Sequence, residues 1–412
     1  MRFSARLRFG RVVSVFPAVL LAAMVAVATP ATADEGFYSP PSPLPAGQNG
    51  DVVKSQPSAF AGGRATRIMY LSRDTKDKPI PVTGTVIVPT TPWTGQGPRP
   101  IVAYAPFTAG MGDQCAVSKT IAGEGSADLV ANVQTQFVNA LLQKGFAVAQ
   151  TDYEGLGTPN AEHAYVMRRS EAHTTLDVVR AAQRLPDSGL AKDAPVGIVG
   201  YSQGGGASAA AVEMAPDYAP ELNLKGAYAG AAPADKAVLA KSLDGAYAAG
   251  FLGFALIGIN TAYPETHMLD LANPAGAQLF MQASRLCTMD AIFQLAYKQT
   301  SALTKDGRPV SAYLAEAPFK AVVDDLRIGN LRPAAPVLVE HTPLDDIVPY
   351  GQGKQLAKDW CGQGANVEFK DLASFTPVFS HALAAFTASG NAATWIADRL
   401  AGKPATGNCG GF

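Results

Sequence analysis

The sequence predicts an α/β fold, in which a mainly parallel β-sheet covered by helices carries an inserted helical cap. Short apolar runs alternate with helical stretches from residue 101 to residue 233, and again from residue 332 onward. Parallel strands buried on both faces read as such apolar runs, and helices connect them. Between residues 234 and 331 this alternation stops and the sequence is mainly helical. We therefore expect core segments at 34–233 and 332–412 and a cap at 234–331.

The composition excludes several other classes of protein. Of the 412 residues, 48% are hydrophobic and 16% are charged, which excludes intrinsic disorder, coiled coil and collagen. The formal net charge is -1, but the first 33 residues contain four arginines and no acidic residue. The remainder holds 29 basic and 34 acidic residues, a net charge of -5. Because a nucleic-acid-binding surface requires clustered Lys and Arg, we expect no nucleic-acid partner.

The first 33 residues predict a secretion signal that is cleaved after Ala33. A cationic stretch, Arg2 to Arg11, precedes the apolar run Val12 to Ala28, and the small residues Ala31-Thr32-Ala33 follow. The alternative is an uncleaved membrane anchor, but the stop-transfer pattern of an anchor is missing. We therefore expect an exported protein with no permanent membrane span, in which any contact with a lipid interface occurs through the cap.

The strands and helices are predicted from apolar periodicity and from turn residues. A Pro- and Gly-rich arm at 39–51 precedes an antiparallel hairpin formed by 64–72 and 81–89. Strand and helix then alternate. The expected strands are 101–105, 146–151, 196–200, 225–229, 336–340 and 366–372, and the expected helices are 126–144, 170–185, 205–214, 353–363 and 382–400.

One turn in this pattern carries a catalytic signature. The sequence Gly200-Tyr201-Ser202-Gln203-Gly204 follows the apolar strand 196–200 and leads into a helix of small residues. A strand, a sharp turn and a helix in this order form a nucleophile elbow, in which the glycines leave room for a strained serine backbone. The alternative is an ordinary glycine-rich turn, which does not require a buried strand before it and a helix of small residues after it. We expect Ser202 to be the nucleophile of an α/β-hydrolase fold.

A serine hydroxyl needs a general base, and the base needs an orienting carboxylate. In hydrolases with this elbow, the acid and then the histidine follow the serine along the chain. His267 lies in the predicted cap and His341 ends a strand, whereas His381 lies between the last strand and the last helix. We expect His381 to be the base. The remaining histidines outside the cap are interpreted as surface or structural residues: His163, His173 and His341.

Two neighbouring aspartates compete for the role of the orienting carboxylate. Asp345 and Asp346 both lie in the loop 342–349, directly after the strand 336–340, where this acid belongs. Asp345 precedes Val348-Pro349 by three residues, the usual placement, so we favour Asp345. The alternative for either residue is a solvated acid in a turn.

The oxyanion formed by nucleophilic attack needs two backbone N–H donors. One is expected at Gln203, directly after the nucleophile, and the other at Thr108, in the loop after the strand 101–105. The triple glycine Gly204 to Gly206 is not followed by the Lys and Ser or Thr of a phosphate loop. We expect neither a metal nor a cofactor.

The cysteines point to an oxidising compartment. The chain contains four, which allow three pairings: Cys115, Cys287, Cys361 and Cys409. An even number in an exported chain favours two disulfides, and the absence of a CxxC sequence argues against a zinc or redox site.

Together these motifs resemble the secretory lipase family. The resemblance covers most of the chain after the predicted signal and includes five further segments: 218–223, 253–256, 316–318, 346–350 and, as in the bacterial branch of the family, 112–115. Proteins of this family are α/β-hydrolases with an inserted helical cap, and they hydrolyse acylglycerols and simpler esters without a cofactor.

The resemblance implies roles for particular residues. It implies Ser202, Asp345 and His381 as the catalytic triad. It also implies two disulfides, Cys115 with Cys287 and Cys361 with Cys409. The apolar cap stretch 247–259 would line a tunnel for an acyl chain, whereas periodicity alone equally predicts a helix packed into the core of the cap. Gln203 stands where a yeast member of the family has glycine, which leaves the backbone N–H in place.

These observations favour a secreted serine ester hydrolase that acts on triacylglycerol or simpler lipid esters through an acyl-enzyme on Ser202. A secreted acyltransferase or peptidase could use the same triad. From a different class, the chain could be a non-catalytic envelope-binding module on a hydrolase scaffold. The expected partner is a small-molecule ester or lipid, and no oligomeric state is predicted.

Overall fold

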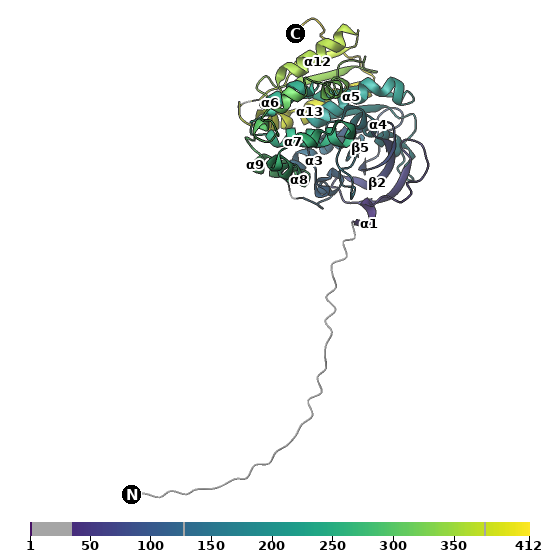
Figure 1. The fold of residues 1–412 in the computed structure, drawn as a ribbon. Coiled ribbons are helices and arrows are strands. Elements are labelled where there is room, and N and C mark those ends of the chain that lie inside the picture. The colour runs from purple at the N-terminus through teal and green to yellow at the C-terminus, as the bar shows by residue number, and fades with distance from the viewer. Residues whose placement is uncertain (2–34, 127, 375) are drawn as a thin grey trace.

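The computed structural model describes residues 1, 35–126, 128–374 and 376–412 (Figure 1). Apart from Met1, the predicted secretion signal 1–33 lies outside the described residues. No helix among the described residues is long and apolar enough to cross a membrane.

A nine-stranded, mixed sheet forms the centre of the molecule, with the order β1-β2-β3-β5-β4-β6-β7-β8-β9. The pairs β1–β2, β2–β3 and β3–β5 are antiparallel, and every pair from β5 to β9 is parallel. The strands are β1 (Val52–Ser58), β2 (Gly63–Arg73), β3 (Pro79–Pro89), β4 (Ile101–Ala105), β5 (Ala147–Thr151), β6 (Val196–Tyr201), β7 (Leu224–Gly230), β8 (Val337–His341) and β9 (Val367–Asp371). This is the α/β-hydrolase fold predicted from the sequence, with a mostly parallel sheet.

The first strand was not predicted. β1 lies at the edge of the sheet, where it pairs with β2 alone, and its side chains are only half-buried. It contains Lys54 and Pro57, which are uncommon in strands. An edge position tolerates proline because one side of the strand has no hydrogen-bond partner. Pairing with β2, and not its own sequence, makes this segment a strand.

Helices cover both faces of the sheet (Figure 1). On one face, buried residues of α3 (Val130–Gln143) and α13 (Ser380–Leu400) pack together. On the other face, α4 (Arg168–Arg184), α5 (Gln203–Tyr218) and α12 (Tyr350–Gly362) form the largest apolar core. Because parallel strands point the same way, β4, β6 and β8 all end at one edge of the sheet, where the candidate catalytic loops follow.

Two helix boundaries differ from the sequence-based expectation. Helix α3 begins at Val130 and not at 126, because the Asp128 carboxylate accepts the backbone N–H of Val130 and the N–H of Ser126 is bonded to Gln114. Helix α5 begins at Gln203 and extends to Tyr218, although Pro216 stands in its last turn. Pro216 has no N–H to donate to the carbonyl oxygen of Val212, and that oxygen instead accepts the backbone N–H of Ala334 at 2.9 Å.

A helical insertion connects β7 to β8. Its α-helices are α6 (Lys236–Leu243), α7 (Ala249–Ala262), α8 (Pro274–Ala283), α9 (Thr288–Gln294), α10 (Val310–Tyr313) and α11 (Phe319–Asp325). These helices have an apolar core of their own, which also contains Tyr165 and Met167 from the loop before α4. The helical insertion is therefore packed on the sheet domain next to the carboxyl ends of the strands.

Two disulfides join distant segments. Cys115, in the loop after β4, pairs with Cys287 at the start of α9. Cys361 in α12 pairs with Cys409. These are the pairings implied by the resemblance. The first disulfide fastens the helical insertion to the loop that follows β4, and the second fastens the end of the chain beside β9.

Candidate active site

The turn between β6 and α5 holds Ser202 in a strained conformation. Ser202 has φ 56° and ψ -123°, a combination that residues with a Cβ seldom adopt. Its backbone N–H donates to Gly230 and its carbonyl accepts from Gly206, so the neighbouring strand and helix fix the turn. Such strain persists only where surrounding structure determines it, and it is concentrated at functional sites.

Two glycines allow the chain to make this turn. A Cβ at Gly200 would lie 1.9 Å from the carbonyl oxygen of Gly204, and a Cβ at Gly204 would lie 2.0 Å from the carbonyl oxygen of Ala105. Both distances are far below van der Waals contact. The G-x-S-x-G pattern therefore reflects backbone packing within the elbow, at Gly200, and of the elbow against β4, at Gly204.

Ser202, His381 and Asp345 form a continuous hydrogen-bonded chain. The Ser202 hydroxyl lies 2.8 Å from His381 Nε2 and donates to it. On the other side of the ring, His381 Nδ1 donates to the Asp345 carboxylate, at 2.8 Å from Oδ2 and 3.0 Å from Oδ1. The aspartate side chain is fully buried, His381 is nearly so, and Ser202 remains partly exposed. This order of groups can remove a proton from the serine as it attacks an electrophile.

Four N–H groups surround the Asp345 carboxylate. Oδ1 accepts the backbone N–H groups of Ile347 and Val348, at 3.0 and 2.7 Å. Oδ2 lies 3.2 Å from His341 Nε2 and also accepts from His381. Burial by itself would raise the pKa of Asp345, but the charge of His381 and the hydrogen bonds from both imidazoles hold that pKa well below its usual range. The carboxylate therefore stays ionised while it orients the base.

His341 is a site residue that the sequence analysis missed. It ends β8 with no exposed surface, and its Nε2 also lies 2.9 Å from the carbonyl oxygen of Val348. Its Nδ1 has no partner among the described residues, which places the ring proton on Nε2. His341 is thus no surface residue but a second imidazole on the candidate catalytic carboxylate. The signal available in the sequence was the spacing of four residues between His341 and Asp345.

Asp346 has a different task from its neighbour. Its carboxylate accepts the backbone N–H groups of Phe379 and His381, at 2.6 and 3.0 Å, and the Tyr247 hydroxyl at 3.1 Å. Since the first N–H groups of a helix lack helical partners, a carboxylate from another loop can cap them. Asp345 therefore holds the ring of His381, and Asp346 holds the start of α13, the helix that carries it.

The side chain of Gln203 is anchored beneath the elbow. Its amide nitrogen donates to Glu171 at 2.8 Å and lies 3.3 Å from His163 Nε2, and the residue is 2% exposed. His163 Nδ1 in turn lies 2.7 Å from the carbonyl oxygen of Glu154. Burial lowers the pKa of His163 to about 4, so its ring is neutral and can accept from Gln203. Glutamine here is a positioned residue and not merely a replacement for glycine.

The backbone N–H of Gln203 has no hydrogen-bond partner within α5, because Gln203 is the first residue of that helix. Thr108 lies in the loop after β4, where the Thr108 hydroxyl bonds the Tyr165 hydroxyl at 2.7 Å. The carbonyl oxygen of Thr108 accepts from the Thr288 hydroxyl at 2.6 Å. The helical insertion, which contains Thr288, thus fixes the loop in which the second oxyanion donor was expected.

The other two histidines outside the insertion are also buried. His163 is 1% exposed, and His173 stacks on Tyr218 with ring centroids 4.0 Å apart. Neither is a surface histidine. No group of three or more Cys, His, Asp or Glu side chains within the described parts of the chain is arranged to hold a metal ion.

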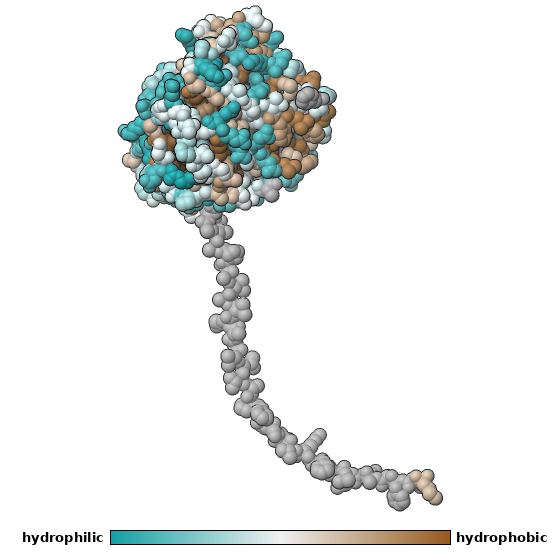
Figure 2. All heavy atoms as spheres, turned by 180° about the vertical axis from the view of Figure 1, so that it is seen from behind, coloured by the Kyte–Doolittle hydropathy of each residue, from teal (hydrophilic) through white to brown (hydrophobic). Residues whose placement is uncertain are grey.

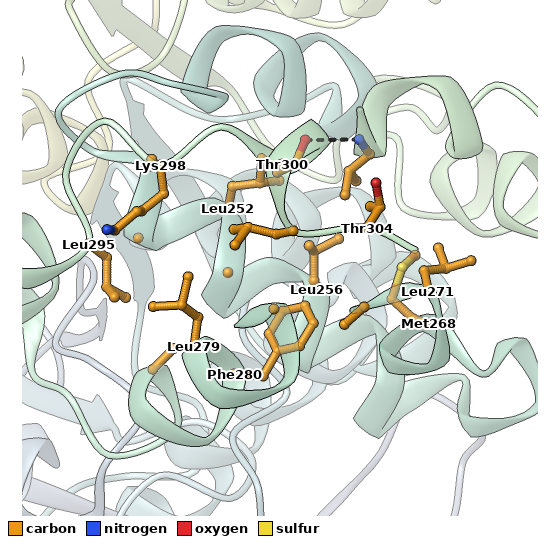
Figure 3. Close-up of a pocket in the computed structure, with 18 residues that line it drawn as sticks. Leu252, Leu256, Met268, Leu271, Leu279, Phe280, Leu295, Lys298, Thr300 and Thr304 are labelled. Atoms are coloured by element: carbon orange, nitrogen blue, oxygen red, sulfur yellow. Dashed lines mark hydrogen bonds between the residues drawn. The ribbon is translucent and has the colours of Figure 1, made fainter. Parts of the chain in front are cut away.

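A narrow apolar cavity lies within the helical insertion (Figure 3). One side of α7 faces it with Leu252, Gly253 and Leu256, and α8 faces it with Leu279 and Phe280. On the opposite side of α7, Phe254 packs edge-on against Tyr165. Helix α7 thus packs into the core of the insertion, as expected, and also lines a cavity; an acyl chain in that cavity stays a prediction. No member of the Ser202 hydrogen-bonded chain is among the residues that line it.

Comparison with known proteins identifies relatives. A family model described as secretory lipase matches residues 125–408. The secreted triacylglycerol lipase LIP4 of Malassezia globosa is 28% identical over 389 residues, which cover 91% of this chain and 83% of that protein. A probable inactive lipase of Mycobacterium tuberculosis is 29% identical over 388 residues, covering 90% of this chain and 83% of that protein. Fungal and bacterial proteins both match, so membership of the bacterial branch stays a prediction.

Solved structures share the fold. Lipase A of Candida antarctica in its closed state superposes with a TM-score of 0.78 at 23% identity, covering 91% of this chain and 89% of that one. The rice cell wall degrading esterase LipA of Xanthomonas oryzae superposes with a TM-score of 0.68 at 18% identity, covering 84% of this chain and 97% of that one.

Replacing Glu154 should change how stability depends on pH. Burial raises the pKa of this carboxyl to about 7, partly opposed by a 2.5 Å hydrogen bond from Ser170. An unfolded glutamate titrates near about 4.3. As pH rises from about 4.3 to 7 the unfolded chain therefore loses this proton first, and the folded protein loses up to about 3 kcal/mol of stability. Glu154→Gln should remove that loss, as measured by denaturant unfolding at pH 5 and pH 8.

The control for this experiment is Glu162→Gln, which removes an exposed carboxylate from the same loop. Relative to wild type, only Glu154→Gln should gain stability at pH 8 over pH 5. Equal pH profiles for the two variants would contradict the burial of the Glu154 charge.

Removing the second imidazole should slow the reaction of Ser202. We expect His341→Leu to lower the rate at which a fluorophosphonate labels Ser202 by roughly tenfold or more, because a hydrogen bond to a charged group contributes about 1.5–3 kcal/mol. His341→Gln retains an N–H near the Nε2 position and should recover most of that rate. The measurement is the labelling rate at fixed pH, with the exposed His267→Leu as control. Equal rates for the leucine and glutamine variants would show that His341 does not position Asp345.

Proposed function

Because this chain belongs to the secretory lipase family, we propose that it is an exported serine ester hydrolase that cleaves triacylglycerol or simpler lipid esters. The observation that carries the proposal is the unbroken chain from Ser202 through His381 to Asp345, with both hydrogen bonds at 2.8 Å. Relatives described as secreted triacylglycerol lipases support the substrate class. A relative is also described as a probable inactive lipase, so the intact chain of three groups matters to the proposal.

In the proposed mechanism, Ser202 Oγ forms a bond to the ester carbonyl carbon while its proton passes to His381 Nε2. Asp345 stabilises the imidazolium without taking the proton. The bond to the alkoxy oxygen then breaks, and the leaving alcohol takes the proton from His381. Water repeats these steps on the acyl-enzyme: His381 removes its proton, the acid departs, and the proton returns to Ser202.

The negative charge of the tetrahedral intermediate needs fixed N–H donors. We assign the first to Gln203 and the second to Thr108. Support for the first comes from the position of Gln203 at the start of α5 and from its side chain, which Glu171 and His163 hold in place. Support for the second comes from the two side-chain contacts that immobilise the Thr108 loop.

We also propose that residues 234–331 act as a cap over the site and that the cavity beside α7 receives the acyl chain. The walls of this cavity are mainly aliphatic, with the ring of Phe280 and with polar groups at Lys298, Thr300 and Thr304, and this mainly apolar lining suits a hydrocarbon. Tyr247, which precedes α7, contacts the ring of Phe379 beside the base, so the cap and the catalytic helix touch at the site.

Export is proposed from the first 33 residues, with cleavage after Ala33. The two disulfides agree with an oxidising compartment.

Substituting the nucleophile tests the function. Ser202→Ala should lower the hydrolysis of esters by a factor on the order of a million, because the triad acts as a unit. Purified protein would be assayed with p-nitrophenyl esters from acetate to palmitate and with triacylglycerol. The control is Ser242→Ala, which alters an exposed serine of α6.

Other outcomes would point to other functions. Near-normal ester hydrolysis by Ser202→Ala would contradict the nucleophile. No hydrolysis by wild type, together with no fluorophosphonate labelling, would favour a non-catalytic binding module. Products that contain an added alcohol in place of free acid would indicate an acyltransferase, and cleavage of peptides alone would indicate a peptidase.

Filling the cavity tests the acyl-chain site. Gly253 faces it from α7, and a Cβ there would meet only Ala283, at 3.9 Å. Gly253→Leu should lower kcat/KM for palmitate esters at least tenfold and leave acetate esters within about twofold, because only the long chain needs the occupied space. Gly351→Leu, at an open position of α12, is the matched control. An equal loss on both esters would contradict the assignment.

A further inference from the structure

An apolar stripe runs along the exposed side of α13. Phe379, Leu383 and Phe386 are 52%, 46% and 49% exposed, and their spacing of four and three residues places them on one side of the helix. Val378, at 58%, precedes the stripe. Scattered exposed apolar residues are ordinary, whereas a contiguous set marks an interaction surface.

The stripe adjoins the candidate catalytic base. The buried side of α13 carries His381, Ala384 and Ala385, so the base and the stripe lie on opposite sides of the same helical turns. Leu344, which is 45% exposed, lies beside the helix start, because its carbonyl oxygen accepts from the Ser380 hydroxyl. The stripe and the candidate base are therefore separated by the width of a single helix, α13.

The neighbouring helix continues the same surface. Gln136 of α3 donates to the Phe386 carbonyl and to the Ser389 hydroxyl of α13, at 3.1 and 2.8 Å. Leu129, directly before α3, is 67% exposed. We call the set the apolar platform, and its members are Leu129, Leu344, Val378, Phe379, Leu383 and Phe386.

The two helices of the platform carry no charge over long stretches. No Asp, Glu, Lys or Arg occurs from residue 372 to residue 397, or from residue 129 to residue 143. Anionic membranes attract basic residues, and charged protein partners are met by opposite charges. These stretches offer neither Lys or Arg nor Asp or Glu side chains. A neutral apolar surface instead matches a neutral lipid, whose binding depends on buried apolar area.

The backbone conformation of Phe379 also keeps its ring exposed to solvent. Phe379 has φ 56°, which is unfavourable for a bulky residue, and the Asp346 carboxylate fixes it by accepting its N–H at 2.6 Å. This strained turn directs α13 into the site and leaves the Phe379 ring half in solvent. Strain of this kind persists at ligand clamps and active sites because surrounding contacts maintain it.

The platform borders the helical insertion. Asp128 accepts the backbone N–H of Met289 in α9, at 3.0 Å, beside Leu129. In Figure 2 hydrophobic residues gather along the right edge of the visible face, the side that carries α8 and α9 at the left of Figure 1.

We propose that the apolar platform docks the protein on the surface of a neutral lipid phase, with the candidate base His381 on the inner side of the same helix. The contact is made by α13 and α3 of the sheet domain, whereas the sequence analysis expected lipid contact through the cap. The proposal goes beyond the hydrolase assignment but rests on it, because hydrolysis of lipid esters is the reason for binding a lipid surface.

Binding would be measured with the full chain carrying Ser202→Ala, so that the lipid is not consumed. The probe is sedimentation with phosphatidylcholine vesicles that contain trioleoylglycerol. Adding Leu383→Ser and Phe386→Ser should lower the partition coefficient at least tenfold, because two large apolar side chains no longer enter the lipid. Leu129→Ser, on the other helix, should lower it less but in the same direction.

Leu331→Ser is the matched control. Leu331 is 40% exposed, but its N–H bonds Glu213 of α5, on the opposite face of the sheet. Its partition coefficient should equal that of the unmodified chain. Replacing part of the phosphatidylcholine with phosphatidylglycerol, or adding 0.5 M salt, should not change wild-type binding by more than about twofold.

Three results would overturn the proposal. Unchanged vesicle binding by the Leu383 and Phe386 double variant would exclude the platform. Loss of binding on Phe293→Ser alone, in the exposed side of α9, would assign docking to the cap. A wild-type dimer that the double variant converts to monomer would show that the platform binds a second copy of this chain.

The same variants separate this inference from the function. With the wild-type serine at position 202, the double variant Leu383→Ser with Phe386→Ser should hydrolyse soluble p-nitrophenyl acetate at the wild-type rate. It should hydrolyse emulsified triacylglycerol at least tenfold more slowly than wild type. Absence of soluble-ester hydrolysis by wild type would refute the function and leave vesicle binding as an independent measurement.

Discussion

The buried carboxylate of Asp345 is the constraint on which the site depends. An ionised carboxylate away from water is costly unless donors surround it, and four donors surround this one. Two come from the backbone of its own loop, one from the end of β8, and one from the helix α13. Each donor fixes one element relative to the others. The same interaction that stabilises the charge therefore places His381 within 2.8 Å of Ser202.

Backbone packing sets the other half of the site. The elbow can approach β4 only because Gly204 lacks a side chain, and it can close on itself only because Gly200 lacks one; both hold the strained Ser202 in place. The anchored side chain of Gln203 adds a second restraint beneath the same turn. Preorganised donors of this kind avoid reorganisation during the reaction, which is the basis of oxyanion stabilisation.

Two apolar surfaces near the site have different proposed roles in binding a lipid substrate. The cavity beside α7 lies inside the helical insertion, whereas the apolar platform lies outside on α13 and α3. Tyr247 and Phe379 meet between them. In the proposed function the platform binds the surface of the lipid phase and the cavity binds one acyl chain. Ser202 then attacks a single lipid molecule while the protein stays bound to the lipid phase.

The sequence by itself determined the local features. Apolar periodicity predicted most strands and helices, and the flanks of G-x-S-x-G predicted the elbow, because each depends on neighbouring residues alone. Edge strand β1 was missed because its pairing with β2 stabilises it. Tertiary structure decided which groups meet: Asp345 on the ring of His381, Asp346 on the start of α13, His341 on Asp345, and Glu171 on Gln203. Ser202 and His381 are 179 residues apart, and only the parallel sheet, which ends its strands at one edge, brings such distant side chains together.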